Sequence, residues 1–310
     1  MSANNLTAVT GKNPKSYAAQ KRTALIASYV FLTVLSIIWV IPIVWVILTS
    51  FRAEPGQYTP GFFPRPYTGV DGDVQFTNAV FTLKNYRDLF TPREGFDFAR
   101  MWLNTFFVSV VSCIISTFFA LATSYVMSRL RFKLRKTFMN IALVMGMFPG
   151  FMSMIAIYFI LKSIGIHQTL GALILVYSAG SGLGFYVCKG FFDTVPKALD
   201  EAAMIDGANK AQVFFHIILP MSKPIVVYQA LNAFMGPWMD FIFAKFLMGT
   251  NYETYTVAIG LYDMLEKERV NTYFRQFAAG SVLVAVPIMI VFMCLQKYYV
   301  EGVTGGAVKG

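Results

Sequence analysis

The stretch TALIASYVFLTVLSIIWVIPIVWVILTSF, residues 23–51, contains 29 consecutive residues without a charge. A bilayer core about 30 Å thick is crossed by roughly 20 apolar helical residues, so this stretch is long enough to span a membrane. It is too long for the apolar core of a secretory signal peptide, which has about 7–15 residues. We therefore interpret it as an uncleaved transmembrane helix, kinked near Pro42.

Four further charge-free stretches have the same character. They contain 28, 25, 26 and 21 residues and lie at 101–128, 137–161, 163–188 and 276–296. A sixth candidate begins at Pro224 and is long enough only if it continues through Asp240. Only helices and closed barrels satisfy their backbone hydrogen bonds in lipid. The pattern therefore predicts an all-α, polytopic membrane protein with six transmembrane helices.

The composition and the placement of charge support this interpretation. Only 14% of the 310 residues are charged, whereas soluble domains carry about 25%. The net charge of +10 would suggest nucleic acid on a soluble protein. Here 15 cations and 5 acids lie in segments 1–22, 129–136, 189–224 and 297–310, and the rest of the chain holds 11 of each. By the positive-inside rule these four segments and both termini are cytoplasmic, and nucleic acid is not an expected partner.

This topology divides the chain into five parts. Residues 1–22 form a polar cytoplasmic tail, which we expect to be disordered. The first transmembrane helix at 23–51 is followed by an extracytoplasmic loop at 52–100. Residues 101–296 form a five-helix core with a cytoplasmic loop at 189–224. A glycine-rich cytoplasmic tail at 297–310 completes the chain.

The outer loop contains FTLKNYRDLF at residues 81–90, which predicts a short amphipathic helix. Leu83, Tyr86 and Phe90 recur at helical spacing and are expected to share its apolar face. The loop as a whole has two interpretations. It is either a folded plug over the outer helix ends or a docking surface for an extracellular protein.

The inner loop 189–224 is too long for a simple connection, which commonly has 2–8 residues. Pro196 suits a first helical turn, KALDEAAMID predicts a compact helix, and Gly207 is placed to end it in a left-handed conformation. VFFHIILP predicts a second helix. The loop is then a helix-turn-helix that protrudes into the cytosol, or alternatively a surface loop lying on the membrane.

Residues Glu201-Ala202-Ala203, Gly207 and Ile217-x-Leu219-Pro220 have the spacing of the EAA motif, and the chain resembles the ABC importer permeases that carry it. The third span, MGMFPGFMSMIAIYFILKSIG, and the C-terminal VEGVTGGAVKG are similar to those of the smaller permease subunit of maltose/maltodextrin importers. The resemblance covers about residues 20–310. It implies the type I ABC importer permease fold in a bacterial cell (inner) membrane.

In that family the loop forms a coupling helix that docks on an ATP-binding subunit. The resemblance implies ATPase-coupling roles for Asp200, Glu201, Ala202, Ala203, Asp206, Gly207, Leu219 and Pro220. The two acids would pair with basic groups of the ATPase, and the two alanines would pack against it. The tail would reach between the ATPase subunits through Gly305, Gly306, Lys309 and Gly310, unless it is simply a frayed terminus.

The implied partners are a second, related permease, two ATP-binding subunits, an extracytoplasmic sugar-binding protein and membrane lipid. The chain lacks the G-x-x-x-x-G-K-[ST] phosphate loop, since Gly11-Lys12 has none of its other elements. We therefore expect a transporter subunit rather than an enzyme, with ATP hydrolysis on a partner. No cofactor or metal is predicted, because His167 and His216 have no other ligand at suitable spacing.

Three residues are candidates for the translocation path. Asp240 carries a charge that costs roughly 2.5–3.5 kcal/mol at the centre of a bilayer, so it either lines or braces the path or lies near the outer headgroups. Met239 stands where the family often has Asn. Trp238 could stack on a sugar ring, and Pro149 marks a break in the third span.

The function predicted from these observations is an ATP-driven importer of a carbohydrate, a malto-oligosaccharide or a similar oligosaccharide. The alternative is a secondary transporter of a small solute. That class would need several intramembrane charges or an internal repeat, and the sequence shows neither. A membrane enzyme is the third possibility, but no nucleophile–base constellation supports it.

Overall fold

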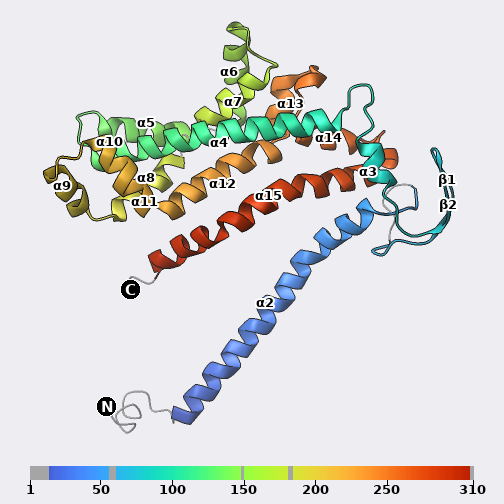
Figure 1. The fold of residues 1–310 in the computed structure, drawn as a ribbon, viewed down its shortest axis with the longest axis horizontal. Helices are drawn as coiled ribbons and strands as arrows, with labels where there is room; N and C mark the ends of the chain where they lie inside the picture. Colours follow the sequence, from blue (N-terminus) through green and yellow to red (C-terminus); the bar gives the residue numbers. More distant parts are fainter. Residues whose placement is uncertain (1–13, 56–60, 148–149, 181–183, 308–310) are drawn as a thin grey trace.

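The computed structural model describes residues 14–55, 61–147, 150–180 and 184–307 (Figure 1). In chain order the elements are α2 (Pro14–Ser50), β1 (Tyr67–Asp71), β2 (Val74–Ala79), α3 (Lys84–Leu89), α4 (Phe98–Arg129), α5 (Arg135–Met147), α6 (Gly150–Ser163), α7 (Leu170–Ala179), α8 (Gly184–Thr194), α9 (Lys197–Ile205), α10 (Lys210–Val213), η2 (Phe214–Ile218), α11 (Leu219–Met221), α12 (Lys223–Met239), α13 (Ile242–Met248), η3 (Tyr252–Thr254), α14 (Val257–Met264) and α15 (Val270–Ala307).

The helical class is confirmed. In the described part of the chain three helices, α2, α4 and α15, are long and apolar enough to cross a membrane, and the number reaches six if each of three bent helix pairs is one span. In the third predicted span the two helices meet at 104°, close to the predicted break. Pro149 itself lies outside the described residues.

The span predicted to begin at Pro224, which is the fifth in chain order, differs from its prediction. Helix α12 ends at Met239, and Asp240 adopts an extended conformation with φ −84° and ψ 106° instead of continuing the helix. The Asp240 carboxylate accepts a hydrogen bond from the Phe243 backbone N–H at 3.0 Å, which favours a new helix start at this point. The continuous span through Asp240 was therefore wrong.

Helix α4 lies along the bundle, and α7, α8 and α12 pack against it (Figure 1). One face of α4 is a stripe of small, buried residues: Thr105, Ser109, Ser112, Ser116, Ala120, Ser124 and Ser128. Small residues let helix backbones approach closely in a membrane protein. The opposite face exposes large apolar side chains, among them Leu103, Phe107, Ile114 and Phe118.

Helix α2 leads away from the bundle and packs against α15, where Trp45 and Phe274 meet at 5.9 Å between ring centroids (Figure 1). Its apolar window has no buried residue. Residues 14–22, expected to be disordered, form the first turns of this helix because no breaker separates them from the apolar run. Residues 1–13 lie outside the described part.

The glycine-rich tail begins as a helix. Helix α15 continues through 297–307, so Gly305 and Gly306 are helical. Lys309 and Gly310 lie outside the described residues. The uninterrupted backbone hydrogen-bond pattern of a long helix carries the chain past glycines that individually weaken it.

The outer loop contains a two-stranded antiparallel hairpin, β1–β2, that the sequence did not predict. The predicted short helix is confirmed as α3, but its predicted face was wrong because Leu83 and Phe90 are exposed. Asn85 is buried instead and donates to the carbonyls of Ser50 and Arg52 at 3.0 and 2.9 Å. These polar contacts to the end of α2, rather than an apolar face, orient the helix.

Candidate functional site

Helix α9 has the start and stop that its sequence predicts. Pro196 immediately precedes the first helical residue. Gly207 has φ +90°, and the Ala208 N–H donates to the Ala203 carbonyl at 2.9 Å while the Gly207 N–H donates to Met204 at 3.1 Å. This pair of bonds is a Schellman cap. The rigid stop fixes the direction in which the chain leaves α9.

The outward side of α9 consists of only some of the predicted residues. Glu201, Ala202, Asp206 and Gly207 are exposed, whereas Ala203 is buried in the packing of its own chain. Ile205 is 86% exposed and Met204 45%, although neither was singled out from the sequence. Glu201 and Ile205 are four residues apart, and this spacing places both side chains on one face of a helix. The sequence could therefore have indicated that Ile205 belongs to the exposed side. The exposed side therefore combines an acid, a small residue and large apolar side chains.

Asp200 faces inward. It is 8% exposed, and its carboxylate lies 3.1 Å from Nε of Arg129, the last residue of α4. The expectation that it pairs with an ATPase was wrong for this reason. Burial raises the pKa of Asp200 above its usual range, and the nearby Arg129 charge opposes that rise in part.

The second half of the loop is helical, as predicted, but it contains a π-helical turn at Phe214–Ile218. The Leu219 N–H donates to the Phe214 carbonyl, five residues back. Pro220 has no N–H to donate to the preceding turn, which favours such an irregularity before it. Ile218 is fully buried, Leu219 is half-buried and Pro220 is exposed, so of the two predicted residues Pro220 reaches the surface more fully.

One side of α9 borders a cavity of about 510 Å³ between the inner loop and the segment that joins α4 to α5. Its charged lining residues are Arg129, Arg131, Arg135, Lys197, Asp200, Glu201 and Lys210. Cations outnumber acids in this lining. The surface beside the exposed side of α9 therefore carries a net positive charge.

The membrane candidates separate into two environments. Asp240 is half-buried at the break between α12 and α13, where the Tyr177 hydroxyl donates to its carboxylate at 2.8 Å. Trp238 is 3% exposed and packs edge-to-face on Trp102 at 5.5 Å. A path-lining role for Trp238 was wrong because its ring faces the protein core. Lys245 pairs with Asp263 at 3.2 Å rather than with Asp240.

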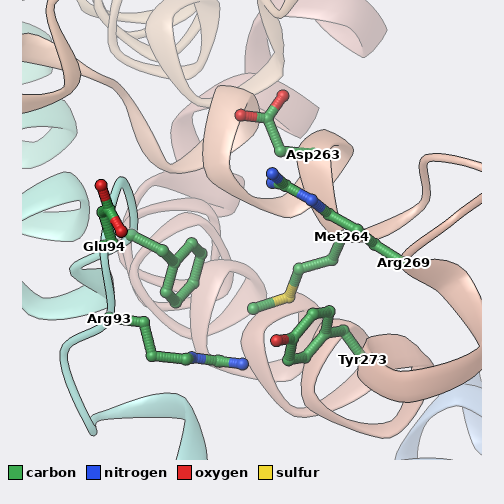
Figure 2. A pocket seen from close by; sticks show the side chains of 7 residues that line it. Arg93, Glu94, Asp263, Met264, Arg269 and Tyr273 are labelled. Atoms are coloured by element: carbon green, nitrogen blue, oxygen red, sulfur yellow. The ribbon is translucent and has the colours of Figure 1, made fainter.

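A smaller cavity of about 140 Å³ lies at the outer ends of α14 and α15 (Figure 2). The Arg93 guanidinium lies 4.3 Å from the centroid of the Tyr273 ring and donates to Gln276 at 2.5 Å. Asp263, also in its lining, is paired with Lys245. These interactions join the segment before α4 to α15. Among the described residues, no group of His, Cys, Asp and Glu side chains could hold a metal ion.

Comparison with known protein families shows which family the chain belongs to. The model of the binding-protein-dependent transport system inner membrane component matches residues 117–305. The chain belongs to this family. The predictions of a transporter subunit, of an inner-membrane protein and of a chain that is not itself an enzyme are confirmed.

Two of its curated relatives match this permease over nearly its whole length, and a third matches over two thirds of it. It is 32% identical to the galactooligosaccharides transport system permease protein GanQ of Bacillus subtilis over 92% of this chain and 96% of that protein. It is 31% identical to the maltodextrin transport system permease protein MalD of Streptococcus pneumoniae over 95% and 99%. It is 33% identical to the maltose/maltodextrin permease protein MalG of Vibrio vulnificus over 67% and 72%. The predicted resemblance to carbohydrate importer permeases is thereby confirmed.

Solved structures support the fold of the permease. A chain of a bacterial ABC transporter involved in the import of the acidic polysaccharide alginate matches with a TM-score of 0.70, covering 90% of this chain and 98% of that one. The sequence identity is 19%. The predicted type I importer permease fold is confirmed at the level of architecture.

Proposed function

We propose that this permease is the membrane subunit of an ABC importer for an oligosaccharide and that α9 couples it to an ATP-binding subunit. The observation that carries the coupling is the division of α9 into two sides. One side holds Asp200 and Ala203 against the permease, and the other leaves Glu201, Ala202 and Ile205 exposed. An exposed helix of this kind, fixed at its stop by Gly207, fits a socket on a partner protein.

The contact combines apolar packing with charge. Ile205 and Met204 would bury apolar side chains in the socket, and Ala202 would let the partner approach the backbone closely. Glu201 and Asp206 would pair with basic groups of the ATP-binding subunit. Since the permease has no phosphate loop of its own, the free energy of ATP hydrolysis would reach it through this contact, as a rigid-body switch between inward and outward access.

The substrate class and the other partners follow from the relatives. Their names specify galactooligosaccharides and maltodextrin, so an oligosaccharide is the proposed cargo. A second permease, two ATP-binding subunits and an extracytoplasmic sugar-binding protein would complete the importer. The excess of cations in the four segments supports a cytoplasmic position for α9 and for both termini in this proposal. The oligosaccharide would cross near Asp240, which braces the break between α12 and α13.

Substitution of Ala202 by Trp tests the socket. The exposed position tolerates Trp in the permease itself, but the larger ring should prevent close docking. We expect the purified Ala202→Trp importer to retain few ATP-binding subunits and to lose ATP-dependent sugar uptake in reconstituted vesicles. Ala211→Trp, at an exposed position of α10, is the matched control and should retain both. Normal subunit retention and uptake in Ala202→Trp would contradict the proposal.

The tail is a separate part of the proposal. We propose that residues Gly305, Gly306, Lys309 and Gly310 contact the ATP-binding subunits, as the resemblance implies. Deletion of 305–310 should lower ATP-dependent uptake while leaving the amount of permease in the membrane unchanged. Unaltered uptake per permease would instead indicate a frayed terminus. ATP-independent uptake by the intact complex would favour a secondary transporter.

A further inference from the structure

The last turn of α4 is attached to the inner loop at several points by one helix face. Tyr125, Ser128 and Arg129 are spaced i, i+3 and i+4, so their side chains share that face. The Tyr125 hydroxyl donates to the Lys210 carbonyl at 3.0 Å, and the Ser128 hydroxyl donates to the Asp193 carboxylate at 2.6 Å. These bonds reach the segments on both sides of α9.

Arg129 makes the connection to α9 itself. Its side chain is 4% exposed, its Nε lies 3.1 Å from the Asp200 carboxylate, and its Nη2 donates to the Val195 carbonyl at 2.8 Å. One guanidinium therefore holds both Val195, which precedes the N-cap residue Pro196, and the first turn of α9. A buried ion pair of this kind is costly to break, because removing either partner leaves the other charge buried and unpaired.

The other end of α4 is attached in a comparable way. The Asn104 side chain donates to the carbonyls of Glu253 and Tyr255 at 2.8 and 3.0 Å, and the Thr105 hydroxyl accepts from the Val257 N–H at 2.8 Å. Thus the segment that leads into α14 is bonded to α4. The 32 residues of α4 span about 48 Å at 1.5 Å per residue.

The route from α9 along the chain itself, through the inner helices and α12, is less direct than the route through α4. The inner helices Lys210–Met221 meet α12 at an angle of 87°, and Ser222 between them is not helical. A bent joint allows rotation, whereas a straight helix bonded at both ends moves as one body. The small-residue stripe of α4 also keeps it in close contact with its neighbours along its length.

We propose that α4 transmits the movement of α9 to the outer segment 253–257, and that Arg129 is the positioning residue that fastens α9 to α4. This rests on the proposed docking of α9 on an ATP-binding subunit. Docking on the ATP-binding subunit and transmission of its movement are then two separate properties of the permease. Docking depends on the exposed side of α9, whereas transmission depends on the buried pair of Arg129 and Asp200.

Arg129→Gln in the complete reconstituted importer tests this transmission. We expect the variant to retain its ATP-binding subunits and to hydrolyse ATP, while the sugar imported per ATP falls by roughly 5- to 150-fold, the range of typical coupling free energies. Arg129→Lys, which keeps the charge, should recover part of the loss. The matched control is Arg275→Gln, which removes an outer ion pair to Asp71 of 2.9 Å and should leave the ratio unchanged.

The outer attachment provides a second measurement. Asn104→Ala should lower the same ratio, and the double variant with Arg129→Gln should be no worse than the more impaired single variant, because both interrupt one path. An unchanged ratio in Arg129→Gln would overturn the transmission role if Ala202→Trp still abolishes docking. If Ala202→Trp is also normal, the proposed coupling function itself fails. A parallel loss of assembled complex and uptake, with an unchanged ratio, would show that the pair serves folding alone and would equally overturn the proposal.

Discussion

The Tyr177 hydroxyl donates a 2.8 Å hydrogen bond to the Asp240 carboxylate and so connects α7 to the break between α12 and α13. The second oxygen of Asp240 accepts from the Phe243 N–H. A single carboxylate thus accepts hydrogen bonds from a tyrosine hydroxyl and from a backbone N–H near the start of α13, in an apolar region. This arrangement explains how the chain tolerates a carboxylate beside a bundle of apolar helices.

Asp240→Ala should destabilise the permease by about 1–3 kcal/mol, because two donors lose their acceptor. Asp240→Asn retains an acceptor oxygen and should cost less. The measurement is thermal unfolding of the purified protein in detergent. Tyr177→Phe combined with Asp240→Ala should be less destabilising than the sum of the single changes. Full additivity would show that the hydrogen bond contributes no stability.

Ser116→Leu should destabilise the bundle by about 1–3 kcal/mol, since a large side chain overpacks the buried stripe of α4. Ser116 is 3% exposed, whereas Ile114 on the opposite side of α4 is 65% exposed. Ile114→Leu is therefore the control and should change the unfolding temperature little. Equal unfolding temperatures for the two variants would contradict close packing along the stripe.

Gly207→Ala should weaken the end of α9 by about 1–2 kcal/mol, because a Cβ is strained in the left-handed region. Nothing lies within 4 Å of a Cβ built at Gly207 or at Gly190. Gly190 lies inside α8 and has no positive φ, so Gly190→Ala isolates the conformational effect and should be neutral or stabilising. Faster amide hydrogen exchange at residues 203–208 in Gly207→Ala alone is the expected result.

Removal of Arg129 should make stability more dependent on pH. The pKa of Asp200 is already raised by burial, and Arg129→Gln removes the charge that opposes this rise. For an acid with a raised folded pKa, the favourable contribution is present at low pH and is lost as the pH rises through that pKa. The deficit in unfolding temperature relative to the unsubstituted protein should therefore be larger at pH 8 than at pH 5.

The additional change Asp200→Asn provides the control for this pH dependence. The double variant has no titrating carboxylate at this position, so its deficit relative to Asp200→Asn alone should be the same at both pH values. A deficit in Arg129→Gln that does not change between pH 5 and pH 8 would show that Asp200 remains ionised without its partner.

The spans could be predicted because lipid imposes a simple rule on every residue that faces it. A charge-free stretch of sufficient length predicts a span without knowledge of its neighbours, and the broken helices near Pro149 still lie mostly within one such stretch. Gly207 was equally predictable, since a local backbone conformation decides its role. The fifth span failed because Asp240 satisfies its carboxylate by ending one helix and starting another.

The side-chain partners could not be predicted from local sequence. Asp200 and Glu201 are adjacent acids of the same helix, yet only Asp200 meets Arg129, which lies 71 positions earlier in the chain. The contact of Trp238 with Trp102 likewise joins residues that are far apart in the sequence. The β1–β2 hairpin was missed because its strands lack a regular apolar alternation. Its Asp71 is held by Arg275 from the other end of the sequence.

The two sides of α4 impose different limits on how its sequence can diverge. Toward the lipid, Leu103, Phe107, Ile114 and Phe118 need only remain apolar, so many substitutions leave the helix equally soluble in the bilayer. Toward its neighbours, size is the limit, and only Gly, Ala, Ser or Thr leaves the spacing between helices unchanged. Two permeases with few identical residues in this helix could therefore have the same bundle, provided that a small residue recurs about once per turn.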